Sequence, residues 1–380
     1  MAVNTESTVL DYLSWRGDLS LQSSAFNEVD GVILARLSYL PFEYLGETAQ
    51  TDLTVGEAAK HLLERPDIAD IALIEGDVPL LHALKDSARF CDMVLSDFVN
   101  EIDENSQTQF SAVCIRTGEN ECYISFRGTD NTLVGWKEDF NMGFVCPVPS
   151  QVLAKGYLSR IAARQAKDTF RVGGHSKGGN LAVYAAAFCE EDVKKRISTV
   201  YNYDGPGFDK AVLEQEGYRE ICMRTRTFVP QSSVVGMLLG HEEAYTIVHS
   251  TQVGLLQHDL YSWEVKRDKF VYLDTVTDGS KLVSFTLKDW LMQTDAATRE
   301  RVVDAIYTVF AETHVHTVKE LGENWYAAAK SMIKTFGTLD EPTKALVNEA
   351  MATLMKSARI GFDKTFRAGK EKQGLTAESR

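Results

Sequence analysis

The central part of the chain alternates short apolar runs with helical stretches. Between about residues 108 and 260, runs rich in β-branched and aromatic residues are separated by segments with helical patterns. This rhythm is typical of βαβ units and predicts a mostly parallel sheet flanked by helices. The runs predicted as strands are Gln109 to Ile115, Glu121 to Phe126, Thr169 to Gly173, Thr199 to Tyr203, Thr225 to Val229 and Ala244 to Val248.

After about residue 290 the pattern becomes helical. Pro342 suits the first turn of a helix and Gly337 suits the end of the preceding one, which gives these boundaries a physical basis. The predicted helices, each with apolar residues three and four positions apart, are Asp295 to Glu312, Val318 to Phe336 and Glu341 to Phe366. The sequence therefore predicts a helical carboxyl-terminal extension.

These patterns divide the chain into four parts. Residues 1–105 mix helical patterns such as Val55 to Leu63 with polar turns, and we expect them to pack on the core. Residues 106–290 are predicted to form an α/β catalytic core, and residues 291–369 a helical appendage. Residues 370–380 lack apolar periodicity and are predicted to be a flexible tail. The length of the chain permits one large core of this kind.

Composition and charge narrow the class of protein. Hydrophobic residues make up 44% of the chain and charged residues 25%, as in ordinary soluble globular proteins. The 40 Lys and Arg residues are outnumbered by 54 Asp and Glu residues, which gives a formal net charge of -14. Because this charge repels a phosphate backbone, we expect no nucleic-acid partner.

The sequence shows no sign of export or membrane insertion. The amino terminus lacks a basic stretch followed by an apolar one, and no segment approaches the length of about 18 apolar residues that a span requires. The six cysteines show no Cys-x-x-Cys spacing, which indicates reduced thiols. We therefore expect a cytoplasmic protein that needs no metal or organic cofactor. Its oligomeric state has no signature in the sequence.

A Gly-x-Ser-x-Gly pattern lies between a predicted strand and a helix-forming stretch. Gly174 and Gly178 each lie two positions from Ser176. A nucleophilic serine needs a sharp, strained turn here, where larger side chains at the two glycines would collide with neighbouring backbone. The following helix directs N–H groups towards developing negative charge. We therefore predict that Ser176, preceded in this elbow by His175, is a nucleophile.

The alternative is a glycine-rich turn in which the serine is incidental, as in phosphate-binding loops. A nucleotide P-loop requires Gly-x-x-x-x-Gly-Lys followed by Ser or Thr. Here Lys177 follows Ser176 instead of preceding it, and the glycine spacing is absent. Nucleotide binding is accordingly the weaker interpretation.

The general base must be a histidine downstream of Ser176, because the chain order in this fold is serine, acid, histidine. His258 follows the last predicted core strand, in the loop where the base belongs, and is the predicted base. His249 is the second candidate. For the remaining downstream histidines a surface or core role is the stronger interpretation: His241, His314 and His316.

The acid must accept a hydrogen bond from the second imidazole nitrogen and fix its tautomer. Asp204 follows the predicted strand Thr199 to Tyr203 and begins a Gly-Pro-Gly turn, so it lies at the carboxyl edge of the sheet. An Asx turn that caps the loop is the competing interpretation. Asp259 ranks lower because side chains adjacent in sequence usually diverge, and Glu242 and Glu243 rank lower still.

The turn after the predicted strand Glu121 to Phe126 suits an oxyanion hole. It contains Arg-Gly-Thr and lies upstream of the nucleophile. The predicted donors to the negative oxygen of a tetrahedral intermediate are the backbone N–H groups of Thr129 and Lys177, helped by the Thr129 hydroxyl. A plain β-turn is the alternative.

Two of these motifs together establish a resemblance. Phe126-Arg127-Gly128-Thr129 followed by Gly174-His175-Ser176-Lys177-Gly178 resembles the class 3 lipase branch of the α/β hydrolases. Further segments resemble the Mbeg-like bacterial family, whose function is largely unassigned: Asp11 to Asp18, Gly135 to Phe140 and Gln257 to Trp263. This resemblance covers roughly residues 8 to 265. It implies an α/β-hydrolase fold in which Ser176 is the nucleophile, His258 the base and Thr129 the oxyanion residue.

One departure from the class 3 lipases concerns the acid. Those enzymes carry it in an Asp-x-Val-Pro-like segment after the next strand, whereas the matching stretch Pro230 to Gly236 offers Ser233. In pancreatic-type lipases the acid follows the strand after the nucleophile helix, which is the place of Asp204 here. If Asp204 points away, the protein has a dyad of reduced activity or is a degenerate hydrolase.

Two apolar segments are candidates for an acyl groove or its cover, with buried core as the alternative for both. Val134 to Val145 follows the oxyanion turn, where class 3 lipases carry their lid, and Val234 to Leu239 is unusually apolar for a loop. Either segment places apolar side chains near the predicted nucleophile.

The sequence thus predicts a serine esterase or lipase-like hydrolase that cleaves small-molecule acyl esters, lipid-like ones in particular, through an acyl-enzyme. The second hypothesis is a catalytically weak member that binds an acyl ligand or a protein partner through the same pocket and the helical end. A thioesterase or amidase with the same nucleophile is the third. Burst release from an activated ester separates the first hypothesis from the second.

Overall fold

A computed structural model gives the fold of most of the chain. It describes residues 6–311 apart from 51, 104, 131, 132 and 144, and then 337, 340–350, 352, 353, 355, 356 and 359. The predicted helix Val318 to Phe336 and the predicted tail 370–380 lie outside the described residues. The predicted helix Glu341 to Phe366 lies within them only in part, and residues 341–350 are helical.

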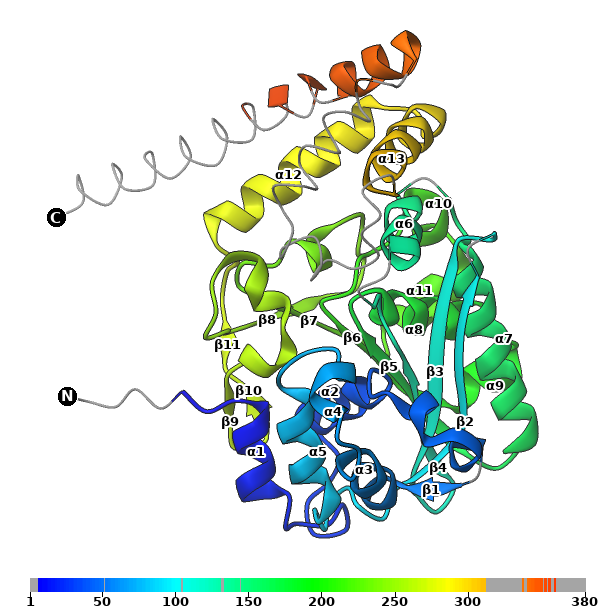
Figure 1. The fold of residues 1–380 in the computed structure, drawn as a ribbon, viewed down its shortest axis with the longest axis vertical. Coiled ribbons are helices and arrows are strands. Elements are labelled where there is room, and N and C mark those ends of the chain that lie inside the picture. Colours follow the sequence, from blue (N-terminus) through cyan, green and yellow to red (C-terminus); the bar gives the residue numbers. More distant parts are fainter. Residues whose placement is uncertain are drawn as a thin grey trace, which may run out of the picture.

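A twisted sheet forms the centre of the described part (Figure 1), and its strands follow the order β1-β2-β3-β4-β5-β6-β7-β8-β11. Strands β4 to β8 run parallel, and antiparallel strands flank them on both sides. The strands are β1 (Leu53–Thr54), β2 (Val94–Asp103), β3 (Thr108–Gly118), β4 (Glu121–Phe126), β5 (Thr169–His175), β6 (Ile197–Tyr203), β7 (Thr225–Pro230), β8 (Tyr245–Val248) and β11 (Tyr272–Leu273). A small hairpin of β9 (Val265–Lys266) and β10 (Lys269–Phe270) stands apart.

Helices cover both faces of the sheet. They are α1 (Val9–Arg16), α2 (Glu28–Leu37), α3 (Val55–Leu63), α4 (Ile68–Ile71), α5 (Asp77–Lys85), α6 (Leu133–Asn141), α7 (Pro149–Arg164), α8 (Lys177–Phe188), α9 (Glu191–Arg196), α10 (Lys210–Leu213), α11 (Glu216–Cys222), α12 (Asp278–Gln293) and α13 (Ala296–Ala311). A mostly parallel sheet with helices on both faces is the predicted α/β-hydrolase fold. None of the described helices is long and apolar enough to cross a membrane.

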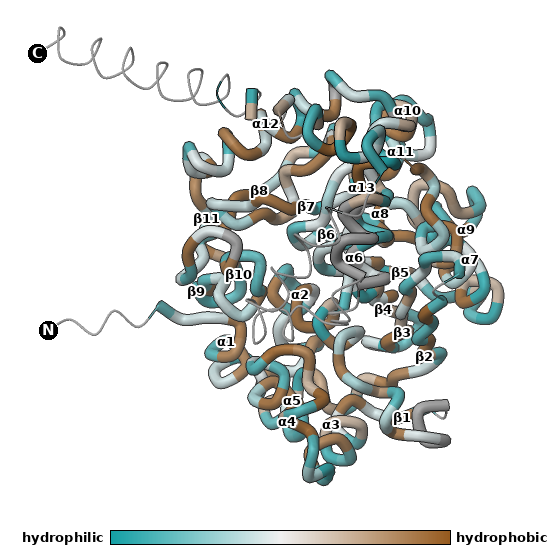
Figure 2. The backbone as a smooth tube through the Cα atoms, turned by 45° about the horizontal axis from the view of Figure 1, so that its top comes forward, coloured by the Kyte–Doolittle hydropathy of each residue, from teal (hydrophilic) through white to brown (hydrophobic). Residues whose placement is uncertain are grey.

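Two apolar cores lie on opposite faces of the sheet. Successive side chains of a strand point to opposite faces, so Val200 of β6 packs in the core under α7 and α8. Its neighbour Tyr201 packs in the core shared with α1, α2, α3 and α5. Figure 2, in which apolar positions are brown, shows them gathered in the strands and in α2. The amino-terminal helices therefore belong to the same folded body as the sheet.

Some elements follow directly from local sequence. Helix α3 has the predicted bounds, because Thr54 and Glu57 form a capping box: the Glu57 N–H donates to the Thr54 hydroxyl, and the Thr54 N–H donates to the Glu57 carboxylate. Helix α13 lies within the predicted segment Asp295 to Glu312. Helix α12 begins at Asp278, after the cap Thr277, so the helical end of the chain begins earlier than predicted.

Strand β2 was not predicted from the sequence. Its side chains are mostly half-buried or exposed, and a register shift lies between Ser96 and Val99, with a left-handed backbone at Asp97 (φ 53°). This bulge interrupts the alternation by which a strand is recognised. The predicted domain boundaries near residues 105 and 290 stay predictions.

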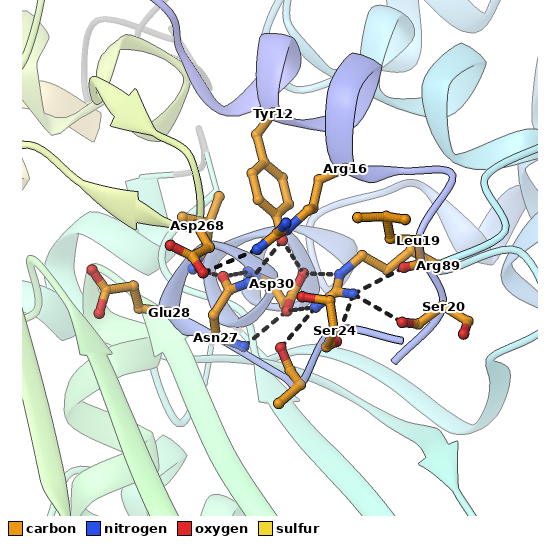
Figure 3. Close-up of polar contacts among 12 residues, drawn as sticks. Tyr12, Arg16, Leu19, Ser20, Ser24, Asn27, Glu28, Asp30, Arg89 and Asp268 are labelled. Carbon is orange, nitrogen blue, oxygen red and sulfur yellow. Dashed lines mark hydrogen bonds and ion pairs between the residues drawn. The ribbon is translucent and has the colours of Figure 1, made fainter. Parts of the chain in front are cut away.

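A buried ion pair ties the amino-terminal segment to the fold (Figure 3). The Arg89 guanidinium donates to both carboxylate oxygens of Asp30, and neither side chain is exposed. Tyr12, in the resemblance segment Asp11 to Asp18, donates to Asp30 at 2.8 Å. Arg89 also donates to backbone carbonyls of the loop between α1 and α2: Leu19, Ser24 and Ala25. Every donor of this guanidinium group has a partner, which is what a buried charge requires.

Candidate active site

Ser176 lies on a sharp turn between β5 and α8. Its backbone is left-handed, with φ 58° and ψ -134°, a conformation that is strained for a residue other than glycine. Its N–H donates to the Tyr203 carbonyl of the neighbouring strand β6 at 2.9 Å. The turn thus places the serine at the carboxyl edge of the parallel sheet, where ligands bind in open α/β sheets.

The two glycines of the pattern are required by close backbone contacts. A Cβ at Gly174 would lie 2.4 Å from the carbonyl carbon and oxygen of Gly178, and one at Gly178 would lie 2.1 Å from the carbonyl oxygen of Phe126. Both distances are far below van der Waals contact. The collision predicted for side chains at these positions is therefore present in the structure.

Asp204 and His258 come together at the same edge. The Asp204 Oδ2 atom lies 2.6 Å from His258 Nδ1, and Asp204 is 0% exposed. Asp204 directly follows β6 with a left-handed backbone (φ 52°). The contact fixes the tautomer of the imidazole, since a carboxylate accepts the Nδ1 proton and leaves Nε2 free to act as a base.

Ser233 supports the acid. It occupies the segment after β7 where class 3 lipases carry their own acid, and its hydroxyl donates to Asp204 Oδ1. The Gly236 N–H donates to the same oxygen at 3.1 Å. One carboxylate oxygen is therefore held by the loop after β7, and the other faces His258. The competing interpretation, an Asx turn at Asp204, does not describe these side-chain contacts.

His258 ends the short helix η3 (Gly254–His258), and its side chain is 29% exposed. Its ring lies against His175, with 4.4 Å between the ring centroids. His175 Nε2 lies 2.9 Å from the His258 carbonyl oxygen, which can only accept, so the imidazole N–H donates there. Burial, together with nearby His258 and Arg36, holds the pKa of His175 well below its usual range. His175 is therefore a neutral packing partner of the predicted base.

The Ser176 hydroxyl forms no hydrogen bond with any residue that the structure describes, His258 included. The contact between Asp204 and His258 is thus formed, whereas a hydrogen bond between His258 and Ser176 is not. Hydrogen bonds of this kind are often long in proteins without bound substrate and tighten in the complex.

The other candidate residues have partners of their own. His249 lies 2.7 Å from Glu264, and His241 lies 2.9 Å from Glu243. Asp259 accepts from the Tyr261 N–H and caps the next short helix. His314 and His316 lie outside the described residues. No group of three or more metal-binding side chains occurs among the residues that the structure describes.

The predicted oxyanion residues differ in what their side chains do. The Thr129 hydroxyl donates to the Asp139 carboxylate of α6, so it is held away from the role of a direct donor. The Lys177 N–H belongs to the first residue of α8 and has no acceptor within the helix. The Lys177 ammonium group points into the interior, where it lies 2.9 Å from Glu138 Oε2 and 2.8 Å from the Gln109 carbonyl.

Asp139 is a buried carboxyl group close to the site. Burial raises the pKa of Asp139 to about 6, against the lowering effect of Lys177, the Thr129 hydroxyl and His258. Its Oδ1 atom is buried without a hydrogen-bond partner among the described residues. The charge of this group therefore changes near neutral pH, one hydrogen bond away from the oxyanion turn.

Tyr39 is a site residue that the sequence analysis missed. Its hydroxyl accepts from the Gly128 N–H at 2.9 Å and donates to the His175 carbonyl at 3.0 Å, so it bridges the oxyanion turn and the nucleophile turn. The Arg36 guanidinium lies over the Tyr39 ring at 4.4 Å and is paired with buried Asp77. No motif surrounds Tyr39, and its partners lie far away in sequence, so only the fold reveals this role.

Comparisons with known proteins identify the family of the chain. The sequence model of the Mbeg1-like family matches residues 84–308, which is more than half of the chain. No curated protein matches the chain. Similar solved structures include a mutant form of MDLA from Penicillium cyclopium, with 18% identity and a TM-score of 0.38 over 66% of this chain and 86% of that one.

Two further solved structures are lipases. The Rhizomucor miehei lipase propeptide complex has 16% identity and a TM-score of 0.37 over 58% of this chain and 67% of that one. Lipase II from Rhizopus niveus has 14% identity and a TM-score of 0.33 over 52% of this chain and 83% of that one. Because these TM-scores are low, the fold assignment depends on the strand order of this chain and not on the matches.

Proposed function

We propose, from the premise that this chain belongs to the Mbeg1-like family, that it is a serine hydrolase that cleaves acyl esters through an acyl-enzyme. The observation that carries the proposal is the 2.6 Å contact between Asp204 and His258, at the sheet edge where the strained turn presents Ser176. A buried carboxylate that orients an imidazole at the sheet edge of a half-buried serine is the arrangement that nucleophilic catalysis requires.

In the first half of the reaction, the Ser176 oxygen attacks the ester carbonyl carbon while His258 Nε2 takes the hydroxyl proton. Asp204 accepts the Nδ1–H and stabilises the imidazolium. The carbonyl oxygen becomes negative and accepts hydrogen bonds from the backbone N–H groups of Thr129 and Lys177. The C–O bond to the alcohol then breaks, and the alcohol leaves with the proton from His258.

In the second half, water attacks the acyl-serine carbonyl carbon, and His258 accepts a proton from that water. The tetrahedral intermediate collapses, Ser176 regains its proton from His258, and the carboxylic acid leaves. No step needs a metal or an organic cofactor. The substrate is a small-molecule acyl ester, including lipid-like esters, and a thioester or amide would react at the same nucleophile.

One observation favours a second candidate function. The Ser176 hydroxyl has no hydrogen bond to His258 among the described residues, so the same site would suit a catalytically weak protein that binds an acyl ligand. A burst of product from an activated ester, equal in amount to the protein, supports the hydrolase. Binding of the ester without a burst supports the second function.

The direct test is labelling by a fluorophosphonate probe, which reacts only with an activated serine. We expect labelling of the wild type, none of Ser176→Ala, and sharply slower labelling of His258→Ala and Asp204→Asn. His249→Ala is the matched control, since His249 is paired with Glu264, and it should label like the wild type. Circular dichroism verifies folding. A well-folded wild type that resists the probe contradicts the proposal.

A further inference from the structure

Helix α6 occupies the position after the oxyanion turn in which class 3 lipases carry a movable lid. The resemblance segment Gly135 to Phe140 lies within this helix. The described side chains of α6 hold it to the rest of the protein at three successive residues: Lys137, Glu138 and Asp139. The question is therefore whether this helix can open.

Glu138 forms the inner attachment and its side chain is 0% exposed. Its Oε2 atom accepts from Lys177 Nζ at 2.9 Å and from the Gln109 N–H at 3.1 Å, and its Oε1 atom accepts from the Ser150 N–H at 2.9 Å. The Lys177 side chain is only 1% exposed. One carboxylate thus joins α6 to β3, to the start of α7 and to the nucleophile helix α8.

The flanking residues attach α6 on two other sides. Asp139 accepts from the threonine hydroxyl of the oxyanion turn. On the outer side, Lys137 pairs with Asp304 of α13 at 3.0 Å, and Arg299 of α13 donates to the Gly143 carbonyl just after α6 at 2.8 Å. Helix α13 lies directly over α6 (Figure 1). The helix is therefore enclosed between the sheet and the carboxyl-terminal helices.

Opening of α6 would separate a buried charge pair. Glu138 would leave the interior, and the Lys177 ammonium would stay behind without a counterion. Removing one partner of a buried pair is strongly unfavourable, and the acyl chains of a lipid offer the stranded ammonium no counterion. A lipid surface consequently supplies no driving force for this movement.

We infer that α6 is a fixed wall of the site and that the protein takes its acyl ester as single dissolved molecules, not from a lipid surface. The inference rests on the proposed ester hydrolysis at Ser176. The formal charge of -14 also repels anionic lipid. Val253 (74% exposed) and Leu256 (64%), which precede His258 in the chain, offer only a small apolar surface to a membrane.

The first experiment measures hydrolysis of tributyrin by the wild type across the solubility limit of the ester. We expect the rate to follow one saturating curve, with no break where emulsion droplets appear. An abrupt rise in rate at that concentration would overturn the inference, because it would show activation by the lipid–water interface.

The second experiment measures amide hydrogen exchange of the wild type in buffer and with phosphatidylcholine vesicles. The amides of residues 133–143 should exchange equally slowly in both, with β5 as the internal reference. Faster exchange of α6 with vesicles, at unchanged rates in β5, would overturn the inference.

A pair of variants tests the attachment itself. Glu138→Gln removes the inner charge and should speed exchange in α6 more than in β5. Asp30→Asn is the matched control, because it removes the charge of a buried carboxylate that pairs with Arg89 away from the site. It should change amide exchange in α6 and in β5 to the same extent. If Glu138→Gln changes the amide exchange rates of α6 and β5 to the same extent, the Glu138 contacts do not hold the helix in place. Lys137→Ala replaces Glu138→Gln if that variant does not fold.

These results separate the inference from the proposed function. Absence of both ester turnover and fluorophosphonate labelling would refute the function, and the exchange measurements would still decide whether α6 is fixed. Turnover of dissolved ester together with an interfacial rise would retain the function and overturn the inference.

Discussion

The Tyr39 hydroxyl is one group on which two turns of the site depend. It accepts from Gly128, next to the predicted oxyanion residue Thr129, and donates to His175, next to Ser176. Without the Tyr39 hydroxyl, the Gly128 N–H loses its buried hydrogen-bond acceptor. The relative position of nucleophile and oxyanion donors would then be less well fixed, although no group that contacts substrate has changed.

Tyr39→Phe should therefore lower kcat by about tenfold and leave KM nearly unchanged, less than the loss of a direct oxyanion donor would cause. Folding stability should fall by about 1–3 kcal/mol because a buried N–H is left unpaired. Tyr123→Phe is the matched control: that buried hydroxyl donates to the Gly31 carbonyl, away from the site. Equal effects of the two variants on kcat would refute a positioning role.

Asp139 couples the site to pH. Burial raises the pKa of Asp139 to about 6, and the pKa in an unfolded chain is near 3.8. Between these pH values the folded protein retains a proton that the unfolded chain has released. The contribution of this carboxyl to stability is thus greatest at low pH and falls as pH rises through this window.

Asp139→Asn removes this titration. The stability of the variant relative to wild type should therefore increase from about pH 4 to about pH 7, by up to about 3 kcal/mol. Urea unfolding of both proteins at several pH values measures the difference, in which effects of all other groups cancel. A difference that does not change with pH would show that the Asp139 pKa is ordinary.

Residue types and chain order were enough to predict part of the site. Ser176 was predicted from its glycine spacing, and Asp204 and His258 from their places after predicted strands; the structure brings the last two into contact. The sequence does not reveal that Ser233 supports Asp204 or that Tyr39 bridges two turns. These contacts join residues distant in the chain and depend on how the strands are ordered.

The nucleophile turn owes its shape to backbone packing between α8 and the end of β4. A Cβ at Gly178 would lie 2.1 Å from the Phe126 carbonyl oxygen, and both atoms belong to rigid elements. By contrast, a Cβ at Gly156, within α7, would meet nothing within 4 Å. Gly178 is therefore required by a close backbone contact, whereas Gly156 is not.

Gly178→Ala should destabilise the protein by at least about 2 kcal/mol, because either strand or helix must shift to relieve the overlap. Gly156→Ala should stabilise it by about 0.5–1 kcal/mol, since alanine is the better helix former. Chemical denaturation of both variants tests the contrast. Similar stabilities of the two variants would mean that the close contact at Gly178 does not constrain the turn.

Regular elements were predicted where local signals are strong. The bounds of α3 and β4 agree with the sequence pattern, since α3 has a capping box and β4 is mostly apolar and buried from Cys122 onwards. Strand β2 was missed because its bulge breaks the alternation, and α12 was missed because it places Ser280 and Ser284 against the protein. Polar residues on an inward face contradict the usual helical signal.

The amino-terminal helices and the sheet share one core, although the family match begins only at residue 84. The Asp30–Arg89 pair connects helix α2 to the segment before β2. Because both side chains are fully buried, loss of one partner leaves the other charge uncompensated in the interior.

Arg89→Leu should lower the free energy of unfolding by about 3–5 kcal/mol, the usual consequence of a stranded buried charge. Arg65→Leu is the control, since the Arg65–Asp67 pair is a third or more exposed and should contribute less than about 1 kcal/mol. Urea unfolding monitored by fluorescence measures both. A small effect of Arg89→Leu would mean that the amino-terminal segment is not essential to the common core.

The outer edge of β2 affects whether the protein aggregates at high concentration. Among the described residues, strand β1 pairs only with Val94 and Leu95, so the remaining edge of β2 has backbone groups with which another copy of the chain can pair. The bulge between Ser96 and Val99 twists this edge, and Glu101 and Asp103 add negative charge along it. A bulge and like charges along an edge strand are two features that discourage pairing between copies, so this edge is protected against aggregation through the sheet.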